Sequence, residues 1–373
     1  MLSRKEIKEL AAIHGDGNIF VSLYLNVNPL TNPKGDYIIH FKNMLKGTLE
    51  KIDKETAKKI KDDIEKIGSY LNAIKRELKK GLGLISSSHS GLWKDYHLAI
   101  PVKNEIIVDK TPYIKPLIDI LDNYQRYAVL LVDKESARLF LIHLGEIEEY
   151  TEVFTPDVPG RHKKGGWFSL SESRYERHTA FHVALHLKDV AKAIEDFLPK
   201  EYIGRIIVGG SEDAVLRLKA MLPHTISEKI IGTFHAEIFS GEKDILERSM
   251  EIMEAFEHKK EQAEIEELIT RAMKNNQAVI GLEDVLLNLR EGRVMKLFLL
   301  KDYSASGFRC VNCGYLTSFM VIPCPYCKGD METVNYLTDL AVQKAVEQGA
   351  LIEVVSDNAR LKEAGSIGAF LRF

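Results

Sequence analysis

The stretch Arg205-Ile206-Ile207-Val208-Gly209-Gly210 is a short apolar run that ends in two glycines, and a helical pattern over 212–221 follows it at once. An apolar run of this length directly before a helix is typical of a buried strand in an α/β fold. Upstream, residues 128–143 predict two strands joined by a turn, and a long helix is expected over 171–197. Because strands and helices alternate in this way, the sequence predicts an α/β domain with a largely parallel sheet.

The amino-terminal part of the chain also mixes strands and helices. An alternating apolar run predicts a strand at 19–27, and strands are also expected near 83–86 and 97–102. Between them, the proline-free region 37–80 has apolar residues at helical spacing among many charges, which predicts a helical hairpin.

The carboxy-terminal part predicts a compact α/β/α unit. Its helices alternate with strands expected at 294–300, 351–355 and 367–373, and a cysteine-bearing insertion at 307–332 interrupts it. The sequence thus predicts a three-domain α/β protein without internal repeats. The expected domains are 1–124, 125–260 and 261–373.

The composition is that of a folded protein without a membrane span. The 373 residues carry 51 Lys and Arg against 54 Asp and Glu, a net charge of −3, so any affinity for nucleic acid must come from a local patch. No run approaches the roughly 18 consecutive apolar residues of a transmembrane helix. Residues 1–10 mix charges instead of forming a secretory signal. We therefore expect a cytoplasmic, monomeric protein that has no membrane partner.

The four cysteines form two Cys-x-x-Cys hooks separated by ten residues. They are Cys310, Cys313, Cys324 and Cys327. Four thiolates on two tight turns can surround a tetrahedral zinc ion, and Gly314 and Gly329 suit turns that aim backbone amides at the sulfurs. Because a closed four-cysteine site leaves no coordination position open, we expect a structural zinc ion in a zinc ribbon at 307–332. A redox-active cysteine pair is the alternative.

A basic, glycine-bearing run is the most informative stretch: Pro159-Gly160-Arg161-His162-Lys163-Lys164-Gly165-Gly166-Trp167-Phe168. Between Pro159 and His178, five cations against two glutamates give a local charge of +3. The cations are Arg161, Lys163, Lys164, Arg174 and Arg177. Gly165 and Gly166 allow close approach of the backbone, the cations can contact phosphates, and Trp167 can stack on a base. The run therefore favours an RNA-binding loop, with an ordinary surface loop as the alternative.

The basic loop is one of several ordered stretches that together indicate a protein family. They are the hairpin at 128–149, the run 158–166 with the Arg- and Glu-bearing helix after it, 278–285, the zinc hooks, and 365–373. In these stretches the chain resembles archaeal and eukaryotic class I peptide chain release factors. In the family, the hairpin opens the central domain and the run 158–166 corresponds to the loop of that domain. The stretch 278–285 resembles the beginning of the third domain, the zinc hooks correspond to a small insertion that some members carry, and 365–373 resembles the closing strand. The likeness covers roughly residues 125–373 and implies a release-factor-like fold.

Two departures from the family bear on function. In the family the loop reads Gly-Gly-Gln and enters the peptidyl-transferase centre, where water attacks the ester that links peptide to tRNA. Here Gly165 and Gly166 remain, but Trp167 replaces the glutamine. An indole N–H cannot present a carbonyl to water, although a backbone amide at this position can stabilise an oxyanion. The first 125 residues contain neither an Asn-Ile-Lys-Ser sequence nor a cysteine, so stop-codon decoding is not expected.

The resemblance then implies a divergent, bacterial-type branch of the release factor and Pelota superfamily, similar to that of the ribosome hibernation factor Balon. By this analogy we expect a ribosome-binding factor in hibernation or rescue. It would occupy the A site, extend its loop toward the peptidyl-transferase centre and the tRNA acceptor end, and contact a translational GTPase. The expected RNA contacts are Arg161, His162, Lys163, Lys164, Trp167, Arg174 and Arg177.

Two other functions stay open. One is a peptidyl-tRNA hydrolase for stalled ribosomes, in which Gly165, Gly166 and Trp167 would be the catalytic residues. The other is an RNA binder that acts off the ribosome.

Three weaker signals have ordinary interpretations. His178, His182 and His186 recur at a spacing that can bind metal, but exposed histidines beside RNA are the more ordinary arrangement. The run 208–210 lacks the third glycine of a nucleotide site, which favours a strand-to-helix turn. The serine-rich run 86–90 lacks the glycine elbow of a nucleophile, which favours a simple turn.

Overall fold

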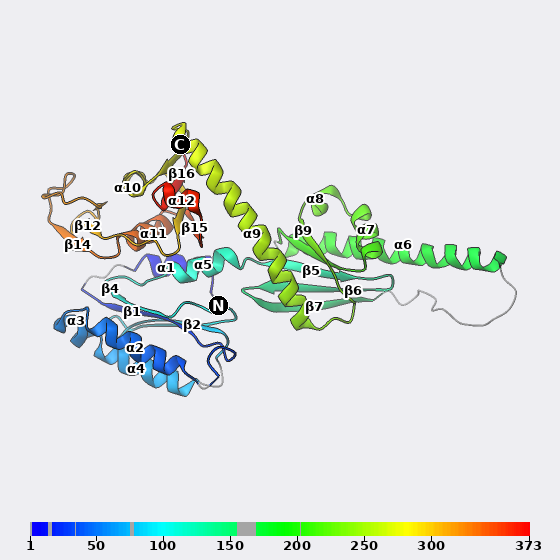
Figure 1. Cartoon of the computed structure of the whole chain (residues 1–373), viewed down its shortest axis with the longest axis horizontal. Coiled ribbons are helices and arrows are strands. Elements are labelled where there is room, and N and C mark those ends of the chain that lie inside the picture. The colour runs from blue at the N-terminus through cyan, green and yellow to red at the C-terminus, as the bar shows by residue number, and fades with distance from the viewer. Residues whose placement is uncertain (1, 14–16, 34, 75–77, 155–168, 202) are drawn as a thin grey trace. The chain divides into compact units, whose positions relative to one another are not determined.

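The computed structural model shows an α/β chain with two compact units (Figure 1). Unit 1 consists of residues 1–123 and 259–373, and unit 2 of residues 124–258. The α/β class expected from the sequence is confirmed, whereas the division into three domains stays a prediction. The structure describes residues 2–13, 17–33, 35–74, 78–154, 169–201 and 203–373, with the backbone alone for 149–154, 169–180 and 200.

The amino-terminal part of unit 1 is an antiparallel sheet of order β3-β2-β1-β4. Its strands are β1 (Phe20–Asn26), β2 (Gly81–Ser87), β3 (Leu92–Leu98) and β4 (Glu105–Asp109). Three helices follow β1: α2 (Tyr37–Leu49), α3 (Lys54–Lys59) and α4 (Lys61–Ala73). Leu23 and Leu84 of the sheet share a buried core with Phe41 and Leu71 of the helices. The apolar spacing in this charged region therefore marks the helix faces that cover the sheet.

Some elements of this part differ from the sequence-based expectation. The strand expected at 97–102 is β3, which begins at Leu92 because a four-residue turn pairs Leu92 with Ser87. The helices α1 (Arg4–Ala11) and α5 (Lys115–Asn123) and the strand β4 were not anticipated. In α1 only three residues are buried, and the Ser3 side chain caps the helix by accepting from the Glu6 amide. At eight residues, the helix is shorter than the stretch of about 11 residues over which a helical period can be recognised.

The serine-rich run 86–90 is a turn, as the sequence favours, and a buried carboxylate anchors it. Asp63 of α4 is 2% exposed. Its Oδ1 accepts from the Ser86 hydroxyl at 2.5 Å, the Ser88 amide at 2.7 Å and the Ser88 hydroxyl at 2.8 Å. These serines therefore fasten a helix to the turn between β2 and β3 and are not a nucleophilic centre.

The carboxy-terminal part of unit 1 has a mixed sheet of order β10-β16-β11-β15. Its strands are β10 (Ala278–Ile280), β11 (Val294–Leu300), β15 (Leu351–Val355) and β16 (Ile367–Leu371). The helices that pack on it are α9 (Glu242–Met273), α10 (Leu282–Arg290), α11 (Leu337–Glu347) and α12 (Ala359–Glu363). The rings of Phe298 and Phe370 meet edge to face, with centroids 5.3 Å apart, in a core that includes Leu268 of α9.

Polar contacts join the two parts of unit 1. Gln343 of α11 donates to the Ala11 carbonyl oxygen at 2.6 Å, and Lys110 pairs with Glu332 at 2.6 Å. Segments that are more than 200 residues apart in sequence therefore fold into one unit.

Unit 2 is a five-stranded sheet of order β7-β6-β5-β8-β9 with helices on both faces. Its strands are β5 (Tyr127–Val132), β6 (Ser136–His143), β7 (Glu146–Phe154), β8 (Ile206–Gly210) and β9 (Ile230–His235). Its other helices are α6 (Ser169–Lys200), α7 (Glu212–Met221) and α8 (His224–Ser227). Leu130 shares a core with Leu187 of α6, whereas its neighbour Leu131 shares one with Ile245 of α9. Burial on both faces explains why β5 is a continuous apolar run.

The expectation of a largely parallel sheet in unit 2 is wrong. The pairs β5–β8 and β8–β9 are parallel, but β5–β6 and β6–β7 are antiparallel. Short turns at 133–135 and 144–145 join β5, β6 and β7, and parallel neighbours need a long crossover. No helix among the described residues is both long and apolar enough to cross a lipid bilayer.

We predict that Asp63→Ala lowers the free energy of unfolding by about 3 kcal/mol, because the buried Ser86 hydroxyl and both donors of Ser88 lose their acceptor. Urea denaturation measures this loss. The matched control is Asp62→Ala, one residue earlier on the same helix at an exposed position, where we expect a change within about 0.5 kcal/mol. Equal losses in both variants would contradict the anchoring role of Asp63.

Candidate functional site

The basic loop expected to bind RNA lies outside the described residues. This applies to Arg161, His162, Lys163, Lys164, Gly165, Gly166 and Trp167, while only the backbone of Arg174 and Arg177 is described, within α6. The elements on either side are described. β7 ends at Phe154, and α6 begins at Ser169. The roles of the loop residues therefore stay predictions, and the structure describes the framework that bears the loop.

The carboxy-terminal half of α6 is anchored in the core of unit 2. Val183, Leu187, Val190 and Ile194 recur every three or four residues and are all buried with residues of β5 and β6. The helix that follows the loop therefore has a firm attachment to the sheet.

Among the side chains that the structure describes, the histidines of α6 do not gather into a metal site. His186 is 1% exposed, and burial lowers the pKa of its imidazole, which favours the neutral ring. His182 is partly exposed and its ring meets that of Phe181 edge to face, with centroids 5.8 Å apart. The side chain of His178 lies outside the described ones. Because His186 is a core residue, its place in the four-residue spacing of the histidines is explained by packing of the helix against the sheet.

The glycines at the end of β8 serve packing, as the strand-to-helix interpretation expects. A Cβ on Gly209 would come within 2.8 Å of the Phe234 ring, and Gly210 has a φ of 150°. The Ser211 side chain then caps α7 by accepting from the Ala214 amide at 3.4 Å. No nucleotide site is needed to explain these residues.

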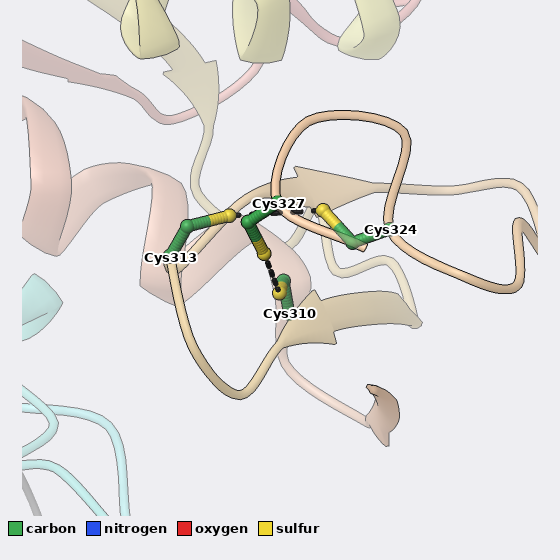
Figure 2. A group of neighbouring side chains, drawn as sticks. All are labelled: Cys310, Cys313, Cys324 and Cys327. Atoms are coloured by element: carbon green, nitrogen blue, oxygen red, sulfur yellow. Dashed lines mark hydrogen bonds between the residues drawn. The ribbon is translucent and has the colours of Figure 1, made fainter. Parts of the chain in front are cut away.

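The four cysteines meet at one point of unit 1, and each hook presents its sulfurs to the other (Figure 2). All four sulfur atoms lie within 4.8 Å of one another. The sulfurs of Cys310 and Cys327 are 3.3 Å apart, and those of Cys313 and Cys324 are 3.7 Å apart. Thiolates that share a tetrahedral zinc ion, each about 2.3 Å from it, lie about 3.8 Å apart. The set therefore fits one tetrahedral metal ion, and both close pairs join one hook to the other.

Each hook is closed by the same pair of backbone hydrogen bonds. In the first, the Cys310 amide donates to the Tyr315 carbonyl at 2.8 Å, and the Gly314 amide donates to the Cys310 carbonyl at 3.0 Å. In the second hook, fourteen residues later, the Cys324 amide donates to the Gly329 carbonyl and the Lys328 amide donates to the Cys324 carbonyl, both at 3.0 Å. The two hooks therefore form the same tight turn, although their residues other than the cysteines differ.

In the second hook, the residue with the left-handed backbone is not the glycine that the sequence suggests. Gly314 has a φ of 67° in the first hook, but Lys328 has a φ of 61° in the second. Gly329 does donate its amide to the Cys327 sulfur, as expected. A Cβ at Gly329 would come within 2.6 Å of the Asn312 side-chain nitrogen, so a larger residue would displace that side chain.

Backbone amides and the neighbouring sulfurs shift the thiol pKa values in opposite directions. The Cys313 amide holds the pKa of Cys310 below its usual value. Burial raises the pKa of Cys324, but the amides of Cys327 and Tyr326 outweigh it, and the pKa falls to about 6. The pKa of Cys313 is raised by burial. Full ionisation of the set therefore requires a nearby cation, which is how thiolates behave around a metal ion.

A small sheet that is attached to α10 holds the four cysteines. Its strand order is β13-β12-β14, with β12 (Gly307–Cys310), β13 (Leu316–Thr317) and β14 (Met331–Val334). Glu283 in the first turn of α10 accepts from the Ser318 amide at 2.7 Å and the Thr317 hydroxyl at 3.3 Å. The Arg290 guanidinium lies 3.0 Å from the centroid of the Tyr326 ring. The sequence gives no local sign of these anchors, because their partners lie more than 30 residues away.

Comparisons with known proteins find release factors and Pelota proteins. A family model described as bacterial archaeo-eukaryotic release factor family 10 matches residues 112–254. Peptide chain release factor subunit 1 of Methanocaldococcus jannaschii is 27% identical, over 100% of this chain and 97% of its own length. A crystal structure of an archaeal translation termination factor is 18% identical, with 99% of this chain and 96% of that chain covered and a TM-score of 0.26. That of Archaeoglobus fulgidus Pelota is 16% identical, with 78% and 79% covered and a TM-score of 0.37.

The family model includes β5 to β9 of unit 2, and the M. jannaschii relative matches the chain from end to end. Both matches extend well beyond the basic loop. They support the release factor family that the sequence resembles.

Proposed function

We propose that this protein binds in the ribosomal A site and extends the loop at 155–168 toward the peptidyl-transferase centre. One observation carries the proposal: a local charge of +3 and the paired Gly165-Gly166 lie in a chain that matches a peptide chain release factor along its whole length. Arg161, Lys163 and Lys164 would hold rRNA phosphates, and the glycines would allow close approach to RNA.

The bound factor occludes the site without hydrolysing peptidyl-tRNA. Trp167 stands where release factors carry glutamine, and its indole offers one N–H donor and no carbonyl acceptor. The ring is suited to stacking on an exposed base or on the tRNA acceptor end. A role in ribosome hibernation or rescue follows from such occupancy. The retained Gly165-Gly166 supports hydrolysis by backbone amides as the second candidate.

Several finer features belong to the same proposal. The chain would act as a cytoplasmic monomer with three domains, 1–124, 125–260 and 261–373, of which the last contacts a translational GTPase. The amino-terminal domain lacks the stop-codon motifs, so it would engage the ribosome without reading a stop codon.

The four-cysteine set would hold a structural zinc ion in a ribbon at 307–332. The sulfur separations and the matched hooks support zinc over a redox pair. With all four ligands supplied by the chain, the ion would stabilise the fold of the ribbon and take no part in chemistry.

We predict that the protein binds ribosomes loaded with peptidyl-tRNA and releases no peptide above the spontaneous rate in a single-turnover assay. The variant Trp167→Gln, which restores Gly-Gly-Gln, should raise the release rate at least tenfold, because the added carbonyl can orient water. Rapid release by the unaltered protein that Gly166→Ala abolishes would overturn the occluding role and favour the hydrolase.

Association with ribosomes should depend on the charge of the loop. We expect Arg161→Ala, Lys163→Ala and Lys164→Ala together to weaken co-sedimentation at least tenfold and to flatten its salt dependence, because three phosphate contacts are lost. The matched control removes three exposed lysines of unit 2, Lys188, Lys192 and Lys243, and should bind normally. Tight, salt-sensitive binding to free RNA without co-sedimentation would instead show an RNA binder that acts off the ribosome.

Elemental analysis should find about one zinc ion per chain. We expect Cys324→Ser to lose the metal and to make residues 307–332 sensitive to trypsin, because metal binding stabilises the folded ribbon. Val311→Ala, at an exposed position inside the first hook, should keep both the metal and the resistance. A ribbon that stays protease-resistant after chelation would exclude a structural role for zinc.

A further inference from the structure

Each close pair of sulfurs in the four-cysteine set combines an exposed residue with a buried one. Cys327 is exposed, and its sulfur lies 3.3 Å from that of the buried Cys310. Cys313 is exposed, and its sulfur lies 3.7 Å from that of the buried Cys324. The sequence contains no cysteine outside this set. A reagent in solution therefore reaches one residue of each pair first, and the second sulfur of that pair is already beside it.

Both close pairs also join the two hooks. Cys310 and Cys313 belong to the first hook, and Cys324 and Cys327 belong to the second. The sulfurs of a disulfide are about 2.05 Å apart, so each pair has to approach by less than about 2 Å to form a bond. The hooks therefore lie close to the arrangement in which two disulfides would join them.

We propose that the four-cysteine set is an oxidation site, at which hydrogen peroxide forms the disulfides Cys310–Cys327 and Cys313–Cys324 and the metal ion leaves. A sulfur in a disulfide no longer has the negative charge with which a thiolate binds the ion. The release of metal rests on the zinc ion of the proposed function, whereas the pairing of the sulfurs rests on their positions alone. Neither depends on binding to the ribosome.

The oxidation takes place in two steps at each pair. The exposed sulfur, that of Cys327, attacks one oxygen of the peroxide, so that the O–O bond breaks and a sulfenic acid and a hydroxide ion form. The buried sulfur, that of Cys310, then attacks the sulfur of Cys327, so that the S–O bond breaks, the S–S bond forms and a second hydroxide ion leaves. The two sulfurs lose two electrons, and these reduce one peroxide. Cys313 and Cys324 consume a second peroxide in the same way.

The two disulfides keep the ribbon at 307–332 folded after the ion has left. Each of them links one hook to the other, as a shared metal ion does, whereas disulfides within the hooks would leave the hooks free to separate. Outside the hooks, Glu283 of α10 accepts from the Ser318 amide at 2.7 Å, and Arg290 lies over the Tyr326 ring. Neither contact involves a sulfur. The oxidised ribbon therefore stays folded and attached to α10 without metal.

Oxidation of the full chain, loaded with zinc and then freed of reductant, tests the pairing. A chromogenic chelator measures the released zinc, and a thiol reagent counts the remaining thiols. We expect about two molecules of peroxide to remove the four thiols and to release about one zinc ion per chain. After the remaining thiols are alkylated and the chain is unfolded, chymotrypsin cuts after Tyr315 and Phe319, between the hooks. Mass spectrometry of the peptides then identifies the linked cysteines.

The peptides decide between the possible results. Linkage of Cys310 to Cys327 and of Cys313 to Cys324 supports the proposal. Any other pairing, sulfinic or sulfonic acids, or thiols that peroxide leaves unaltered would overturn it. A chain that holds no zinc before oxidation but forms these two disulfides supports the oxidation site and contradicts the zinc site, so the two failures are distinguishable.

Trypsin measures whether the oxidised ribbon stays folded. With a chelator present, cleavage at Arg309 and Lys328 should be at least tenfold slower in the oxidised chain than in the reduced one, because only the oxidised hooks remain joined. Dithiothreitol should abolish this difference, since it reduces disulfides and leaves oxidised methionines unchanged. Equal cleavage rates of the oxidised and reduced chains would refute the linkage between the hooks.

Discussion

The packing of α6 on the sheet of unit 2 is the constraint on which the account of function depends. The helix buries one apolar face from Val183 to Leu198 against β5 and β6, and β7 is paired with β6 up to Phe154. The segment 155–168 therefore starts and ends on elements that the same sheet holds. A loop borne in this way can be long and glycine-bearing, because its scaffold and not its own structure sets where it begins and ends. The proposal that this loop acts on the ribosome comes from the likeness of the chain to release factors.

The sequence predicted the elements whose burial shows as a local period. The strands at 294–300 and 351–355 and the helix at 212–221 have the expected bounds, since each is a continuous apolar run or a capped amphipathic helix. The sequence also predicted that the four cysteines gather, because their spacing is itself the geometry of the site. It missed β9, an edge strand that is half-exposed along its length and so has no clear apolar pattern.

Features set by distant partners could not be predicted in this way. Glu283 becomes an anchor of the cysteine-bearing sheet, and Lys328 takes the left-handed turn position, only because the fold brings other backbone groups to them. Lys301 and Asp119 lie 2.6 Å apart although 182 residues separate them in the sequence. No local pattern marks such residues, since each is an ordinary charged residue until its neighbours exclude water. The predicted roles of the loop residues rest on the local charge, on the paired glycines and on the likeness to release factors.

The four cysteines of unit 1 are close in sequence and lie together beside one small sheet. The central claim, however, concerns where unit 2 acts. A reconstruction of the protein bound to ribosomes at a resolution that separates side chains tests it most directly. The account predicts that the loop at 155–168 lies beside the peptidyl-transferase centre, with Arg161, Lys163 and Lys164 on rRNA phosphates. A factor bound outside the A site, or one whose loop contacts only its own chain, would contradict it.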